Sequence, residues 1–135
     1  MTDISHYMSS FRKTSWDPMK GESLISDDSY PVYDFDGIAA DICREWRMGE
    51  NLSSCDGMII TDRIYLVEFK NQRMMNIDRK VLAKKAFDTL YLIQHALPDK
   101  KLTIEEIGKS CILYVVHAGS DSASFSGFRS KAASF

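Results

Sequence analysis

Hydrophobic residues return at every fourth position in two stretches of the chain, and both stretches predict helices. The first contains Ile38, Ile42 and Trp46, and Asp36 just before it is a favourable N-cap. The pattern therefore predicts an amphipathic helix over residues 37–48, and the glycine at the next position ends it.

The second stretch runs from Asp78 to Leu97, and the proline that follows it is a helix stop. Spacing of three and four residues puts five apolar side chains on one face: Leu82, Ala86, Leu90, Ile93 and Leu97. We therefore predict a helix over residues 78–97 that packs this face on the rest of the protein.

Three β-rich runs predict strands. The sequences CDGMII at 55–60 and IYLVEFK at 64–70 flank a polar link of three residues. Because a link this short joins the strands of a hairpin, we expect the two runs to pair antiparallel. The third run, CILYVV at 111–116, is apolar throughout and predicts a strand buried on both faces. Helices and strands together indicate an α/β fold of the α+β type, with a mixed sheet.

The remaining segments carry weaker signals. Residues 1–33 mix aromatic and polar side chains without a sustained period, so we expect an irregular N-terminal segment with at most one short helix. Thr103 and Glu106 have the spacing of a capping box, which predicts a short helix over 104–109. The tail at 119–135 is rich in serine, and we expect it to be loosely ordered.

The composition is that of one folded domain, because 44% of the 135 residues are hydrophobic and 27% are charged. We expect residues 1–135 to form this single domain and its core to span 34–118. No apolar run approaches the roughly 18 residues that cross a bilayer, and the first ten residues lack the features of a secretory signal. We therefore expect a cytoplasmic protein that does not span a membrane. The three cysteines form no CxxC pair, which argues against a disulfide framework or a structural zinc site.

The net charge of −2 hides an asymmetry along the chain. Residues 1–62 carry a net charge of −7, whereas residues 63–135 carry +5. The basic side chains are densest over a short segment: Lys70, Arg73, Arg79, Lys80, Lys84 and Lys85. Such a density could meet a polyanion such as nucleic acid, although a solvated helix face would show the same pattern.

Two carboxylates and a lysine are the candidate chemistry of the predicted hairpin. If the turn has three residues, Ile60 pairs with Ile64, and Asp56 then faces Glu68 with about 5 Å between their Cβ atoms. Lys70 lies on the same face because side chains alternate along a strand. Two carboxylates this close suit a divalent cation such as Mg²⁺ or Mn²⁺, and together with a lysine they could hydrolyse a phosphodiester. The alternative is an exposed cross-strand charge pair.

This arrangement resembles the PD-(D/E)XK, or restriction-endonuclease-like, nuclease superfamily, whose core runs α-β-β-β-α-β. The resemblance extends from about Asp36 to His117. It rests on the first helix, Asp56, the Glu-Phe-Lys sequence at 68–70, and the long helix and apolar strand that follow. The order of an acid-bearing helix, Asp and Val-Glu-Phe-Lys is similar to Holliday-junction resolvases and related small nucleases. Cys55 stands where the superfamily name has proline, a position that varies.

The resemblance implies a role for each matching residue. Asp56 and Glu68 are the implied metal ligands, and the main-chain carbonyl of Phe69 is often a third. Lys70 is the implied catalytic lysine. Magnesium, or manganese in its place, is the implied cofactor.

Three further positions are implied less directly. The acid that this subgroup carries on its first helix would fall on Glu45, with Asp41 as the alternative. Either residue could equally be a solvated helix residue. Gln72 lies just beyond the Glu-x-Lys sequence, where some members place a polar active-site residue.

The leading hypothesis is a metal-dependent endonuclease, a hydrolase that acts on nucleic acid, with DNA as the expected substrate. Phosphate contacts are expected from Gln72 and the nearby basic residues: Arg73, Lys80, Lys84 and Lys85. A second hypothesis is a catalytically inactive module of the same fold that binds nucleic acid or protein. A third is a phage or mobile-element accessory protein, which the net negative charge favours. We also expect a homodimer, because a two-strand cut needs two sites.

Overall fold

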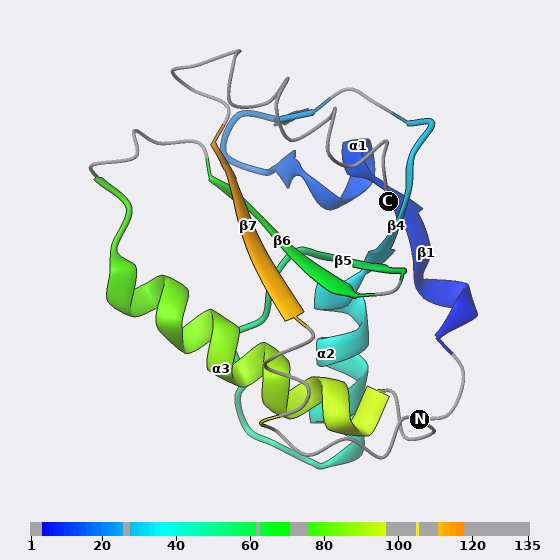
Figure 1. Ribbon diagram of the computed structural model, residues 1–135, viewed down its shortest axis with the longest axis vertical. Helices are drawn as coiled ribbons and strands as arrows, with labels where there is room; N and C mark the ends of the chain where they lie inside the picture. The colour runs from blue at the N-terminus through cyan, green and yellow to red at the C-terminus, as the bar shows by residue number, and fades with distance from the viewer. Residues whose placement is uncertain are drawn as a thin grey trace.

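A mixed β-sheet organises the fold, which is drawn in Figure 1 from a computed structural model. The structure describes residues 4–25, 28–61, 63–70, 76–96, 105 and 111–117. Within these ranges, five strands form the main sheet in the order β1-β4-β5-β6-β7. Their bounds are Met8–Ser10 for β1, Pro31–Asp34 for β4, Gly57–Ile60 for β5, Ile64–Lys70 for β6 and Cys111–His117 for β7. Strands β6 and β7 are parallel, and the other neighbours are antiparallel.

Helices and a small hairpin complete the described elements. The 3-10 helix η1 (Ser5–Tyr7) and the short helix α1 (Phe11–Thr14) precede a hairpin of β2 (Trp16–Asp17) and β3 (Glu22–Ser23). The two long helices are α2 (Phe35–Glu45) and α3 (Arg79–Ala96). Among the described helices, none is both long and apolar enough to cross a membrane.

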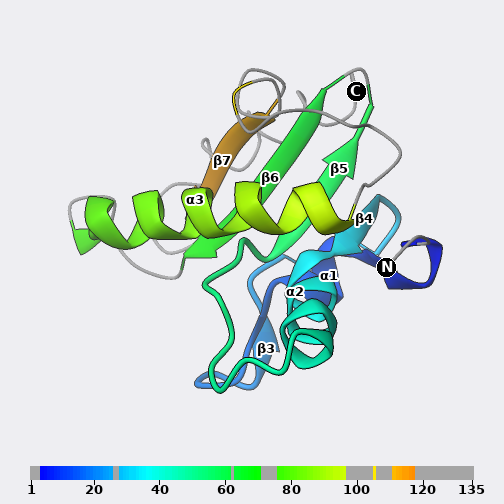
Figure 2. The ribbon, with the colours of Figure 1, turned by 90° about the horizontal axis from the view of Figure 1, so that it is seen from below.

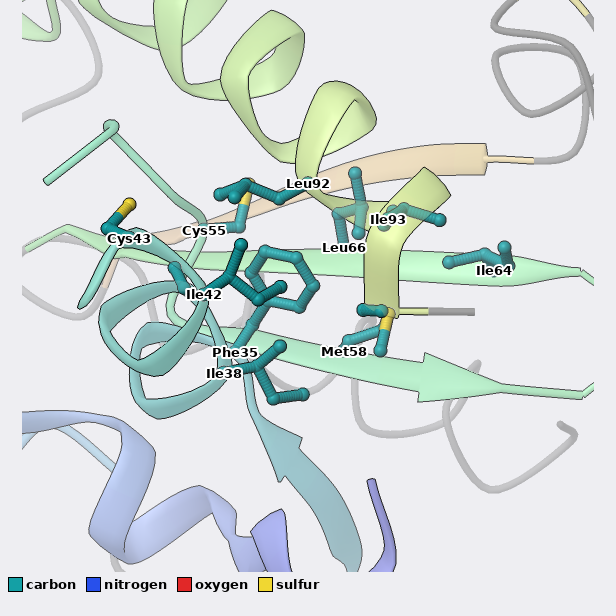
Figure 3. Close-up of a cluster of buried hydrophobic side chains, with 12 residues drawn as sticks. Phe35, Ile38, Ile42, Cys43, Cys55, Met58, Ile64, Leu66, Leu92 and Ile93 are labelled. Atoms are coloured by element: carbon teal, nitrogen blue, oxygen red, sulfur yellow. The ribbon is translucent and has the colours of Figure 1, made fainter. Parts of the chain in front are cut away.

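The sheet is covered on both faces. Helices α2 and α3 pack on one face (Figure 2). There Phe35 and Ile42 of α2 share a buried cluster with Leu66 of β6 and Ile93 of α3 (Figure 3). Helix α1 covers the other face, where the ring of Phe11 meets the ring of Phe69 edge-on at 6.1 Å between centroids. Met58 and Ile59 of β5 and the uninterrupted apolar run at 64–67 of β6 are therefore buried from both sides.

The predicted hairpin is confirmed, including its register. Gly57 pairs with Val67 and Ile60 with Ile64, so the pairing is the one expected for a three-residue turn. The strand expected at 111–116 is also confirmed as β7. Its described side chains, at 111–113 and 115, lie on both faces and are only partly buried, so the prediction of burial on both faces is not met.

The N-terminal segment differs most from expectation. Residues 1–33 were expected to be irregular, but β1 and β4 pair with each other and β4 joins the sheet through β5. These strands have three and four residues, too few to produce a visible period of two. Long-range pairing, rather than local pattern, therefore decides their structure.

Both long helices were predicted at nearly their true positions. Helix α2 begins two residues earlier than expected, because the side chain of Asp34 caps it by accepting from Gly37 N at 3.1 Å. On α3 the deepest residues are Leu92, Ile93 and Ala96, together with Thr89, whereas the predicted Leu82, Ala86 and Leu90 are only partly buried. The predicted Leu97 and the tail at 119–135 lie outside the described residues. Of the helix predicted at 104–109, only Glu105 is described, and it is helical.

The order of elements also differs from the expected α-β-β-β-α-β core. Between α2 and α3 the described chain holds two strands, β5 and β6, and β4 comes before α2. The observed order is thus β4-α2-β5-β6-α3-β7, which is a mixed α/β fold without the expected run of three consecutive strands in the described residues.

Candidate active site

The hairpin brings Asp56 and the end of β6 together, at the end opposite its turn. Asp56 immediately precedes β5, and its backbone O accepts a hydrogen bond from Phe35 N at 3.2 Å. Its side-chain Oδ2 accepts a hydrogen bond from Phe69 N at 2.7 Å. Asp56 is therefore fixed both to the start of α2 and to β6.

Glu68 is the most deeply buried charged residue of the site, with 2% of its surface exposed. Its Oε1 atom lies 2.5 Å from Lys85 Nζ and 3.4 Å from Lys70 Nζ. Its Oε2 atom is buried without a hydrogen-bond partner in the described part of the chain. Leaving a buried carboxylate oxygen unpaired is costly, so this atom is open to a ligand that could satisfy it.

Asp56 has an unusual affinity for protons. Burial is the main reason that its pKa rises from 3.8 to about 8, and the charge of Glu68 is the second. The hydrogen bond from Phe69 N and the charge of Lys85 act in the opposite direction. The two carboxylates are thus close enough to repel, and without a cation Asp56 keeps a proton at neutral pH.

Lys85 has a different place from the one expected. It was expected to contact phosphates, but its side chain is 22% exposed and bonds Glu68. Burial alone would lower the pKa of Lys85, but the hydrogen bond with Glu68 and the negative charges of Glu68, Asp56 and Asp36 together outweigh burial, so the pKa is raised. The sequence held a partial signal, because Lys85 lies three residues after Leu82 and therefore next to it on the helix surface.

Asp36 is a site residue that the sequence reasoning missed. It lies in the first turn of α2, where its Oδ1 accepts a hydrogen bond from Ser54 Oγ at 2.7 Å. Its negative charge acts on both neighbours, raising the pKa of Asp56 and favouring the charged form of Lys85. The sequence pattern predicts Asp36 as the N-cap of the helix, with no other role. In the structure the N-cap is Asp34.

Glu45 is not part of this site, which corrects the expectation for the first-helix acid. It is the last residue of α2, ten residues after Phe35, and a helix of that length separates its ends by about 15 Å. Its Oε2 lies 3.5 Å from His95 Nε2. The alternative, Asp41, accepts hydrogen bonds from the Tyr7 hydroxyl and from Arg44 Nη1. Neither acid is brought to Asp56.

The other expected nucleic-acid contacts lie on α3 or outside the described chain. Lys80 is exposed in the first turn of α3. Lys84 Nζ lies 2.9 Å from Asp88 Oδ2 and 3.1 Å from Ser53 Oγ, with 63% of its side chain exposed. Gln72 and Arg73 fall outside the described residues.

A cleft of about 210 Å³ opens at this end of the hairpin. Asp56, Phe69 and Lys70 line it on one side, and residues 14–18 with Leu24 line it on the other. The N-terminal segment thus forms a wall of the candidate site. Asp56 and Lys70 face the same space, as a shared role in chemistry would need.

The donors available to a cation are few. In the described ranges, no group of three or more His, Cys, Asp or Glu side chains is placed to hold a metal ion. Asp56 and Glu68 offer two carboxylates, one with an unpartnered oxygen, and Phe69 contributes a main-chain carbonyl to the same strand end. This set fits Mg²⁺, which binds through one or two carboxylates and keeps several waters.

The chain was compared with protein-family models, with curated proteins and with solved structures, and none of the three comparisons found a match.

Proposed function

We propose that the protein is a metal-dependent nuclease of the PD-(D/E)XK type that hydrolyses phosphodiester bonds of nucleic acid. The observation that carries the proposal is the buried, unpartnered Oε2 of Glu68 beside Asp56, a carboxyl whose pKa is raised to about 8. Strongly perturbed acids in a cleft are typical of functional sites. A purely structural carboxylate would be expected to have both of its buried oxygens hydrogen-bonded.

In this proposal Asp56 and Glu68 hold Mg²⁺ or Mn²⁺, with the main-chain carbonyl of Phe69 as a third ligand. When bound, the ion supplies a Lewis acid for the phosphoryl oxygen and a bound water of lowered pKa. Asp56 gives up its proton on binding, because both carboxylates are needed in the ionised form.

The lysines of the site have separate roles. Lys70 lines the cleft beside Asp56, so it orients the attacking water and stabilises the negative charge that develops on the phosphate. Lys85, on α3, binds Oε1 of Glu68 and so holds the carboxylate in place, which leaves Oε2 for the ion. Lys85 is thus a positioning residue. Lys80 and Lys84, exposed on α3, contact substrate phosphates.

The test is cleavage of labelled duplex, junction and single-stranded DNA and RNA with Mg²⁺, Mn²⁺ or EDTA. Lys70→Ala should abolish cleavage yet keep the rise in melting temperature that metal causes, because it removes no ligand. Asp56→Ala should lose both. Lys20→Ala is the matched control, since Lys20 is an exposed lysine that does not line the cleft, and it should cleave like the wild type.

The competing function is a catalytically inactive module of the same fold that binds nucleic acid or protein. The observation that favours it is the contact of Glu68 with two lysines, which already balances the carboxylate's charge without a metal. This module would be favoured if the wild-type protein cuts no substrate and neither metal raises its melting temperature. DNA as substrate, the homodimer and an accessory role in a phage or mobile element stay predictions.

A further inference from the structure

Trp16 is a large aromatic residue whose side chain is exposed on the surface. It is the first residue of β2, and 56% of its surface is accessible. A tryptophan side chain gains more than most from burial, so an exposed indole often marks a contact surface.

Two hollows adjoin at this side chain. One is the cleft that holds Asp56 and Lys70, with Trp16 in its opposite wall. The other has a volume of about 590 Å³ and is lined by Arg12, Lys13, Trp16, Ser23 and Asp28. A chain molecule that extends from the cleft into the second hollow therefore passes over the indole.

The second hollow presents cations beside the aromatic ring. Arg12, Lys13 and Trp16 are all exposed, and all three line this hollow. Arg12 Nη1 lies 3.3 Å from Asp28 Oδ2, but both side chains are more than half exposed. Such an exposed pair contributes little stability, so a phosphate can replace Asp28 as the partner of Arg12. An aromatic face with cations beside it is the combination that binds single-stranded nucleic acid.

The backbone around Trp16 is fixed before any ligand binds. The buried Ser15 accepts a hydrogen bond from Ile25 N through its Oγ at 3.0 Å, and its backbone O accepts one from Leu24 N at 3.0 Å. Ser10 caps α1 by accepting from Lys13 N. Both ends of the short segment are thus anchored, so an indole held there loses little freedom when a base stacks on it.

We propose that Trp16 is a base-stacking platform for a single-stranded segment of nucleic acid, whose phosphates contact Lys13 and Arg12. The strand runs from this platform into the cleft, so the proposal rests on the proposed function for the place of the reacting phosphate. A base in a duplex already stacks on both neighbours, and it must leave the stack before it can stack on Trp16. The substrate class is therefore nucleic acid with a single-stranded region next to the cleaved bond.

The test uses the full chain in EDTA, so that binding is measured without cleavage. The sequence contains two tryptophans, and Trp46 lies elsewhere, packed edge-on against Tyr91 and His95. Trp46→Phe leaves Trp16 as the only tryptophan, and titration with a single-stranded oligothymidylate or oligouridylate should quench its fluorescence to saturation. A blunt duplex of matched length should not. Trp16→Phe, which keeps Trp46, is the control and should show no quenching.

Affinity gives a second readout. Stacking on an aromatic side chain contributes about 1–3 kcal/mol per base, so Trp16→Ala should weaken binding of the single strand by about 5- to 150-fold. Trp46→Ala should leave it unchanged. Lys13→Ala should reduce the salt dependence of binding without removing the quenching.

The outcomes separate this proposal from the proposed function. Absence of quenching, equal quenching by the duplex, or wild-type affinity in Trp16→Ala would overturn the stacking platform, even if the protein cleaves with Mg²⁺. The protein could instead cleave nothing with either metal and yet show the quenching and the loss of single-strand affinity in Trp16→Ala. That result would support the stacking platform and reject the nuclease.

Discussion

Replacing Asp56 with asparagine should stabilise the metal-free protein, and the gain should depend on pH. The carboxyl is held next to Glu68 in a site where burial opposes its charge. Its folded pKa is raised above the unfolded value, so the stability it contributes is present in full below pH 3.8 and is lost as pH rises through about 8. An amide is never ionised and does not suffer this loss.

The magnitude follows from the two pKa values. The pKa rises from 3.8 to about 8, and each unit corresponds to about 1.4 kcal/mol, so the loss by pH 8 is at most on the order of 5 kcal/mol. An amide oxygen accepts a weaker hydrogen bond from Phe69 N, which offsets about 1 kcal/mol. Allowing for relaxation around the ionised group, we expect Asp56→Asn to gain about 2–4 kcal/mol at pH 8.

The assay is urea unfolding of both proteins in EDTA between pH 5 and 8.5. Equal m-values would show that both proteins expose the same surface on unfolding, so that their stabilities can be compared. The gain should be small at pH 5 and grow steadily towards pH 8. Asp41→Asn is a control of opposite sign, because hydrogen bonding from Tyr7 lowers the pKa of Asp41. That variant should be less stable at pH 7 and approach the wild type at low pH. If Asp56→Asn is destabilised at every pH, the carboxylate is ionised and satisfied without metal, and the reasoning is wrong.

Two further substitutions test how the site is held together. Lys85→Ala leaves Glu68 in its buried position with Lys70 at 3.4 Å, and should cost about 3 kcal/mol in urea unfolding. Lys84→Ala removes a side chain that is 63% exposed, and should cost less than about 1 kcal/mol. Equal losses would show that Lys85 does not support Glu68. Gly57→Ala should cost about 1–3 kcal/mol, because a Cβ there would lie 2.9 Å from Val32 Cγ2. Adding Val32→Ala should recover part of that loss relative to Val32→Ala alone, and purely additive losses would contradict the steric cause.

The sequence by itself determined the hairpin and therefore the centre of the candidate site. Strand residues alternate between faces, and a slip of one position would turn Leu66 and Glu68 to the opposite face. A three-residue link left one register, and that register puts Asp56 opposite Glu68, as the observed pairing of 57–60 with 64–67 implies. The long helix was equally visible, because a pattern sustained over 18 residues is a local property.

Local pattern was insufficient where an element depends on a distant partner. Strands β1 and β4 are short, and each owes its conformation to pairing with residues far away in the sequence. The same limit applies to the site wall. Nothing in the sequence around Trp16 shows that it lines the same cleft as Asp56, because that depends on how α1 folds over the sheet.

Only the tertiary structure decided which charges belong to the site. A helix pattern gives the face on which an acid lies but not which end of the helix meets the sheet, so Glu45 was chosen where Asp36 is the nearby acid. Likewise Lys84 and Lys85 are neighbours in the sequence, yet α3 turns one to the surface and the other to Glu68. The physical reason is that a pairing energy depends on distance and burial, and both are set by packing between elements rather than by the order of residues in the chain.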